Sequence, residues 1–114
     1  MAYGTPVIGT RQGALPEFIT DGVNGVLLEL ETNPLGEWIY SASGGREKPE
    51  FEALFRDEVE RLAHQTLAAG QAALADPAAY QAMRRQARAD ARSRFDAQSA
   101  NVFWDDLYEK SVTA

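Results

Sequence analysis

The residues best suited to chemistry lie in one short turn near the beginning of the chain, Thr10-Arg11-Gln12-Gly13. The turn leads into Leu15-Pro16-Glu17-Phe18-Ile19, where proline and glutamate suit the first turn of a helix. A strand, a glycine turn and a helix N-terminus together present backbone N–H groups to an anion such as phosphate. We therefore assign Thr10, Arg11 and Gly13 as candidate binding residues on the phosphate side of a ligand.

Two short strands must position this turn. Pro6-Val7-Ile8-Gly9 is a short apolar run, which is typical of a buried parallel strand, and proline is allowed at its first position. The cluster Asp21-Gly22-Val23-Asn24-Gly25 predicts a tight turn, because glycine and asparagine tolerate positive φ. A second strand is expected to follow at once, from about Val26 to Leu30.

Together these stretches run in a fixed order: Met1-Ala2-Tyr3-Gly4-Thr5-Pro6-Val7-Ile8, then Gly13-Ala14-Leu15-Pro16-Glu17-Phe18-Ile19, then Asp21-Gly22-Val23-Asn24-Gly25-Val26-Leu27-Leu28. The order resembles a motif of the retaining glycosyltransferases of the GT-B fold, A-M-A-x-G-x-P-V-[VI]-x-[ST]-x-x-G-G-x-x-E-[IVF]-[IV]-x-[DE]-G-x-x-G-x-L-[VL]. One position departs from it, since the family's paired glycines are Gly13-Ala14 here. The methyl group of Ala14 narrows the approach of a phosphate to the backbone.

The resemblance implies the C-terminal half of a donor-binding domain. Such an enzyme moves a sugar from a nucleotide diphosphate sugar to an acceptor hydroxyl. The transfer retains the anomeric configuration of the sugar and needs no metal. In the family, two glutamates that hold the donor sugar and its ribose directly precede the motif, and here the chain starts after both. We therefore expect no catalytic residue, no cofactor and no metal site in the chain itself, with the nucleotide sugar bound by the full-length enzyme.

Residues 31–50 form an expected loop insertion. They hold prolines and glycines without sustained periodicity, and a loop of about 20 residues inside a compact domain is uncommon. Trp38 and Tyr40 are its large side chains. They either pack the loop against the core, which we favour, or stack on a sugar or a partner as part of a lid.

From Phe51 onward the pattern predicts helices. Apolar positions three and four apart indicate a first helix of about 24 residues, with Gly70 weakening its last turns. Asp76-Pro77 caps and starts a second helix, and Asp96 caps a third from about Ala97 to Lys110. One broad apolar face of this last helix comprises Ala100, Phe103, Trp104, Leu107 and Tyr108. The helices also resemble the C-terminal helices of the family, so the resemblance covers nearly the whole chain apart from the loop.

The other polar candidates have ordinary explanations. His64 is the sole histidine, and we expect it to be solvated on the polar side of its helix. Asp105 and Asp106 are neighbours on a helix and point about 100° apart, which disfavours shared acid and base chemistry. An arginine cluster could meet a diphosphate or lipid headgroups, but we favour a charged outer face near a helix C-terminus. Its members are Arg84, Arg85, Arg88, Arg92 and Arg94.

The length, charge and composition of the chain limit the classes of protein to which it can belong. The 114 residues are 45% hydrophobic and carry a net charge of −6, which fits at most one domain and argues against nucleic acid as a partner. The chain has no cysteine, and no apolar run long enough for a transmembrane segment or a signal peptide. We expect a cytoplasmic protein.

The fold expected from these features is α/β, a partial Rossmann-like unit of the kind found in the GT-B C-terminal domain. It has two short parallel strands, about four helices and a helix-rich C-terminal half. We expect a single partial domain over 1–114, divided into the strand-turn-helix-strand motif (1–30), the loop insertion (31–50) and the helical part (51–114). Two strands leave both sheet edges open, so we expect either a homo-oligomer or a missing N-terminal part. The alternative function is a non-catalytic interaction or oligomerisation module.

Overall fold

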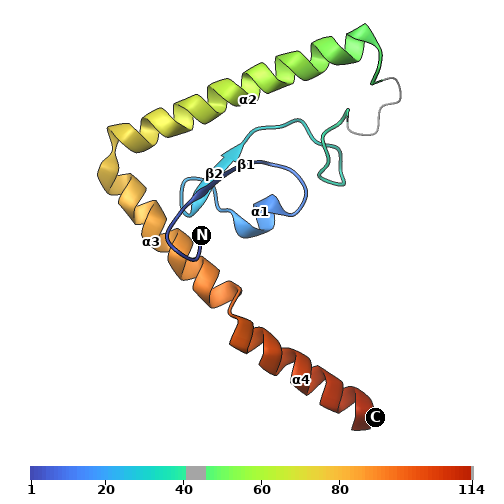
Figure 1. Ribbon diagram of the computed structural model, residues 1–114, viewed down its shortest axis with the longest axis vertical. Coiled ribbons are helices and arrows are strands. Elements are labelled where there is room, and N and C mark those ends of the chain that lie inside the picture. Colours follow the sequence, from blue (N-terminus) through green and yellow to red (C-terminus); the bar gives the residue numbers. More distant parts are fainter. Residues whose placement is uncertain (41–45, 114) are drawn as a thin grey trace.

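The computed structural model describes residues 1–40 and 46–113. Two short strands and a four-residue helix precede three long helices (Figure 1). Their order is β1 (Val7–Thr10), α1 (Leu15–Phe18), β2 (Gly25–Leu28), α2 (Pro49–Ala75), α3 (Pro77–Arg94) and α4 (Ala97–Thr113). The prediction of an α/β chain with two short parallel strands and a helix-rich C-terminal half is confirmed.

The two strands pair in parallel, from Val7 opposite Gly25 to Thr10 opposite Leu28. β1 begins one residue later than predicted, because Pro6 has no N–H to give to the ladder. β2 begins one residue earlier than predicted, at a glycine. A Cβ atom on Gly25 would stand only 2.6 Å from the carbonyl oxygen of Val7, so the close approach of the strands requires glycine there.

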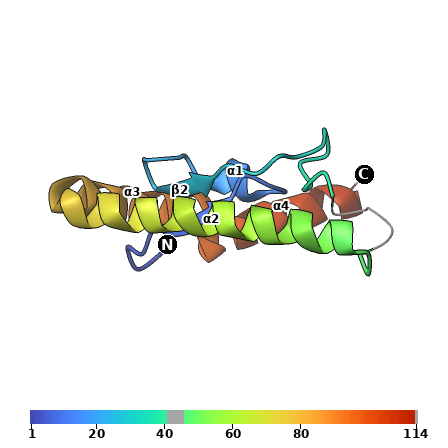
Figure 2. The same cartoon turned by 90° about the horizontal axis from the view of Figure 1, so that it is seen from above.

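The long helices form an open angle around this small sheet. α2 and α3 meet at Asp76, and the sheet lies inside the angle between them, while α4 continues away from the sheet (Figure 1). Figure 2 shows how flat the arrangement is, in keeping with principal extents of 59 × 43 × 19 Å. The radius of gyration is 19.0 Å, whereas a compact domain of this length would have about 13 Å. The chain therefore leaves much of its helical surface uncovered.

The predicted helix caps are confirmed. Asp76 accepts a hydrogen bond from the Ala79 N–H (2.9 Å), and Asp96 accepts one from the Ser99 N–H (2.7 Å). α2 begins at Pro49 rather than Phe51, so the last two residues of the predicted loop are helical. Proline suits the first helical position, since its fixed φ is already helical and its missing N–H would have no partner there.

The core is small and lies where the sheet, the 20–25 turn and α3 meet. Its buried apolar residues are Ile19, Leu27, Leu28, Leu30 and Ala87. Asn24 is also fully buried and joins the turn to α3: its side chain accepts from the Thr20 N–H (2.8 Å) and donates to the Phe18 carbonyl (3.1 Å) and to Asp90 (2.7 Å). A buried amide with all of these partners specifies how the turn and the helix meet.

Candidate functional site

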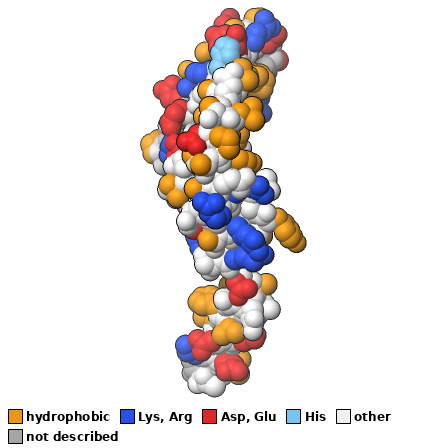
Figure 3. Space-filling view, turned by 90° about the vertical axis from the view of Figure 1, so that its left-hand side faces the viewer, with side chains coloured by type: hydrophobic (Ala, Val, Ile, Leu, Met, Phe, Trp, Pro, Cys, Tyr) orange, Lys and Arg blue, Asp and Glu red, His pale blue; other side chains and the backbone are white. Residues whose placement is uncertain are grey.

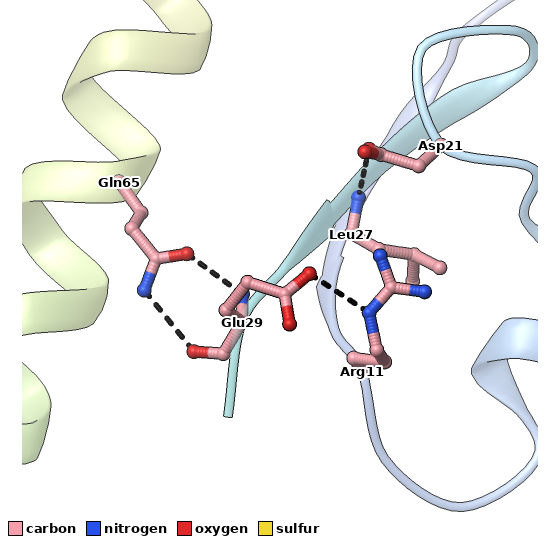
Figure 4. Close-up of polar contacts among 5 residues, drawn as sticks. All are labelled: Arg11, Asp21, Leu27, Glu29 and Gln65. Atoms are coloured by element: carbon pink, nitrogen blue, oxygen red, sulfur yellow. Dashed lines mark hydrogen bonds and ion pairs between the residues drawn. The ribbon is translucent and has the colours of Figure 1, made fainter. Parts of the chain in front are cut away.

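The three predicted binding residues lie together at the carboxyl end of β1. Thr10 is the last residue of the strand, and the Arg11 N–H donates to the Leu28 carbonyl (2.8 Å) at the end of β2. The Arg11 guanidinium donates to the Glu29 carboxylate at 2.9 Å, and the two side chains face one another across the strand ends in Figure 4. This pair compensates the one positive charge of the turn within the chain.

The backbone donors of the turn also have partners inside the chain. The Gly13 N–H donates to the Gly36 carbonyl (2.7 Å), and the Gln12 N–H donates to the Thr10 carbonyl (2.8 Å). The Leu15 N–H donates to the Gln12 carbonyl (3.2 Å). A phosphate at this turn would therefore have to displace existing acceptors, Gly36 first among them. The anion site stays a prediction, and a phosphate would have to break the hydrogen bond from Gly13 to Gly36 to bind there.

The bond from Gly13 to Gly36 also anchors the loop insertion to the turn. Within the insertion, the Asn33 side chain accepts from the Leu35 N–H (2.9 Å) and the Glu37 N–H (3.0 Å), which folds residues 33–37 into a local turn. An isolated antiparallel bridge pairs Thr32 with Trp38. The described part of the insertion therefore has its own structure and lies directly on the candidate binding turn.

A cavity of about 470 Å³ lies between the turn, the insertion and the first turns of α2. Its lining residues are Gln12, Gly13, Gly36, Glu37, Trp38, Arg46, Phe51 and Phe55. Trp38 is its central aromatic, with ring-centroid distances of 6.0 Å to Phe51 and 6.2 Å to Phe55, both edge to face. Trp38 therefore packs the loop against α2 rather than against the buried core, and Tyr40 joins this cluster through Trp38, with ring centroids 5.3 Å apart. Residues 41–45 of the insertion lie outside the described residues.

The chemistry of this cavity is mixed and close to neutral. Three aromatic rings form its apolar walls, while Gln12, Glu37 and Arg46 supply an amide, a carboxylate and a guanidinium. In the described part of the chain, the Trp38 indole N–H is the one buried side-chain donor without an acceptor. Leaving such a donor unpaired costs about 1–3 kcal/mol. Small-molecule sites combine aromatic walls with a few polar groups in this way.

A second hollow, about 940 Å³, lies between the sheet and the corner of α2 and α3. Its walls are mainly apolar and include Ile8, Val26, Leu67, Tyr80 and Met83. The two carboxylates at its margin already have structural roles: Asp21 accepts from the Leu27 N–H (2.8 Å; Figure 4), and Asp76 caps α3. This hollow offers apolar surface rather than reactive groups.

The remaining sequence candidates do not gather into a site. His64 is exposed on α2, as predicted, and Asp106 pairs with Lys110 (2.6 Å) rather than with Asp105. Two of the five clustered arginines do more than form an outer face, because Arg84 donates to the Gly4 carbonyl (2.8 Å) and Arg94 to the Glu17 carbonyl (2.6 Å). Among the residues that the structure describes, no cluster of His, Cys, Asp or Glu could hold a metal, and no helix is long and apolar enough to cross a membrane.

Gln65 is a positioning residue that the sequence reasoning missed. Its side chain accepts from the Glu29 N–H (2.7 Å) and donates to the Glu29 carbonyl (3.1 Å), so it acts as a strand partner at the end of β2 (Figure 4). From the sequence we assign no role to Gln65, which is the neighbour of the solvated His64. Its spacing from Leu62 and Ala69, three and four residues, was the signal that it lies on the face toward the sheet.

Comparison of the chain with protein-family models, with curated proteins and with solved structures finds no match in any of the three.

Proposed function

We propose that this chain is the C-terminal half of the donor-binding domain of a retaining glycosyltransferase with a GT-B, Rossmann-like fold. The observation that carries the proposal is the role of the glycines of the motif. Gly4, Gly13 and Gly22 have φ values of 76°, 54° and 72°, a backbone conformation that residues with a side chain rarely adopt. Gly25 stands where a Cβ would meet the Val7 carbonyl. Each motif glycine therefore has a physical reason to be glycine in this parallel unit.

The position of the candidate residues supports the same function. In open parallel sheets, ligands bind in the crevice outside the carboxyl ends of the strands. Thr10, Arg11 and Gly13 lie at that end of β1, beside a cavity large enough for a small molecule. On this proposal the turn faces the diphosphate of the nucleotide sugar in the full-length enzyme, where basic side chains and helix N-termini stabilise phosphate charge without a metal.

The chain alone should not transfer sugar. Transfer needs donor and acceptor held in reacting geometry between two domains, and the family's glutamate pair is not in this sequence. Reading the coding DNA upstream of Met1 tests the proposal. We expect an in-frame pair of glutamates separated by seven residues directly before Met1. An in-frame stop codon there, or an open frame without the pair, would contradict the proposal.

A second candidate function is an interaction or oligomerisation module, and α4 favours it. Every residue of α4 is exposed, including Trp104, which keeps 51% of its surface open to solvent. Figure 3 shows exposed hydrophobic side chains next to charged, mainly acidic ones at the end of the molecule that α4 forms. The Trp104 ring contacts those of Phe103 and Tyr108, with centroid distances of 5.6 and 6.1 Å. Burying such a face at about 25 cal/mol per Å² favours association.

This second function predicts a homodimer or a higher oligomer, formed through α4 or through pairing of the open sheet edges. Light scattering across a concentration series measures it directly. Leu107→Gln on α4 should weaken the association, whereas Leu35→Gln, at another exposed leucine in the loop, should leave it unchanged. A cooperative monomer at high micromolar concentration would exclude this module.

A further inference from the structure

Gly70 is a glycine that the described part of the chain does not itself require. It lies inside α2, where glycine weakens a helix relative to alanine, and its φ is outside the left-handed region that favours glycine. Among the described residues, a Cβ atom on Gly70 would meet no heavy atom within 4 Å beyond its own neighbours and the backbone of its helix. Glycine is also favoured where another molecule approaches the backbone closely. Gly70 therefore indicates that a surface from outside the chain reaches α2 at this point.

Gly70 lines the hollow of about 940 Å³ between the sheet and the corner of α2 and α3. The side chains beside it on the two helices are small, which lets a second helix approach closely; they are Ala69, Ala72, Ala73 and Ala79. The charged side chains among the described lining residues are two carboxylates, Asp21 and Asp76. They disfavour an anionic apolar ligand such as a fatty acid. The hollow therefore suits an apolar surface that carries no acidic group.

α4 presents such a surface. Its aromatic face is exposed and comprises Phe103, Trp104, Leu107 and Tyr108. The acidic residues Asp105, Asp106 and Glu109 lie on the other side of the helix, because the helical repeat is about 3.6 residues. In its own copy, α4 continues away from the sheet and from the hollow (Figure 1). The aromatic face therefore meets a hollow of this kind on another copy of the chain.

The areas decide how two copies meet. A buried aromatic side chain covers about 150–250 Å², and the three rings of α4 keep between half and two thirds of their surface open, so roughly 350 Å² remains to be buried. One contact, counting both surfaces, buries roughly 700 Å², which is typical of crystal contacts below about 800 Å². Two such contacts bury roughly 1,400 Å², and stable specific interfaces bury about 1,200–2,000 Å². A single contact between two α4 helices is too small, whereas a reciprocal pair of contacts is large enough.

We infer that the aromatic face of α4 docks in the hollow of a second copy, over Gly70, while α4 of that copy docks in the hollow of the first. The same two surfaces meet twice, as a twofold axis requires. The inference rests on the second candidate function, association of the chain with itself, and it names the surface that meets α4.

Filling the hollow tests the inference. Gly70→Leu places a side chain in the hollow, where the chain leaves open space, and leucine also favours helix over glycine. Ala68→Leu is the matched control, because Ala68 is exposed on α2 and lies about 200° around the helix from Gly70. Sedimentation equilibrium of the 114-residue chain measures the dissociation constant of the dimer. We expect Gly70→Leu to raise this constant at least about tenfold, and Ala68→Leu to leave it unchanged. Far-UV circular dichroism verifies that both variants keep their helices.

A mixture of two variants tests whether α4 is the occupant. An isotope-labelled Leu107→Gln chain keeps its hollow but has a polar residue in its aromatic face, whereas an unlabelled Gly70→Leu chain keeps its aromatic face but has a filled hollow. Such a pair retains one of the two contacts. In NMR spectra we expect the Gly70 amide signal of the labelled chain to shift and saturate as the unlabelled chain is added. An unlabelled chain that carries both substitutions should cause no shift.

The outcomes separate this inference from the function on which it rests. A parent chain that stays monomeric at high micromolar concentration would overturn both the association and the docking in the hollow. If the parent chain forms a dimer that Gly70→Leu leaves intact, association stands and docking in the hollow is wrong. If Gly70→Leu abolishes the dimer but the mixture leaves the Gly70 signal unchanged, α4 is not the occupant.

Discussion

Replacing Asn24 by alanine should remove the buried polar link between the 20–25 turn and α3. The side chain is fully buried and makes two hydrogen bonds to backbone groups, of Thr20 and Phe18, and one to the carboxylate of Asp90. The neutral bonds contribute about 1 kcal/mol each and the charged one about 2 kcal/mol, so the loss is about 4 kcal/mol. Domains are typically stable by only about 5–15 kcal/mol, and this chain has a small core. We therefore expect Asn24→Ala to be largely unfolded.

Urea denaturation followed by far-UV circular dichroism measures this loss. Asn101→Ala is a matched control, because Asn101 is exposed on α4 and alanine favours helix. Its free energy of unfolding should stay within about 0.5 kcal/mol of the parent value. If Asn24→Ala lowered the free energy of unfolding by less than about 1 kcal/mol, the three bonds of Asn24 would not stabilise the turn and its contact with α3, and the description of the core would be wrong.

Three further perturbations test other parts of the structure. Gly25→Ala should cost about 2–3 kcal/mol in urea denaturation, because its Cβ would meet the Val7 carbonyl at 2.6 Å; an unchanged midpoint would refute the close strand approach. Gln65→Ala should cost about 1–2 kcal/mol and speed amide exchange at Glu29, since it removes both bonds to that residue; unchanged exchange would contradict the strand-partner role. The N–H and then the hydroxyl of Ser99 lower the pKa of Asp96, so its stabilisation of α4 is complete above the unfolded-state pKa and is lost as pH falls through the lower folded value. Helicity should therefore decrease below about pH 4, and Asp96→Asn should remove this part of the pH dependence; an identical pH profile in the variant would refute it.

The local elements of this fold could be read from the residues because each depends on neighbours in the chain. The apolar runs gave the strands to within a residue or two, and Asp76 and Asp96 marked helix starts through their own side-chain bonds. β1 begins one residue later than predicted for a local reason, the missing N–H of Pro6, whereas β2 begins earlier at Gly25 because of its close approach to Val7 on the other strand.

The candidate site could be predicted only in part. Thr10, Arg11 and Gly13 were expected at one strand end and lie there, but the acceptor of the Gly13 N–H is Gly36, from a loop without periodicity. Arg11 and Gln65 belong to elements far apart in the sequence, and both form hydrogen bonds with Glu29. Such contacts depend on how the elements pack, and neither propensity nor spacing specifies them.

On the proposed function, this chain completes a donor-binding domain and transfers no sugar alone. The most direct measurement compares nucleoside diphosphate release from a panel of nucleotide sugars by the 114-residue chain and by the polypeptide extended through the upstream coding region. We expect release by the extended polypeptide and none above the buffer blank by the chain alone. Turnover that tracks the purified 114-residue chain, or an extended polypeptide that is folded but inactive with every donor and acceptor tested, would contradict it.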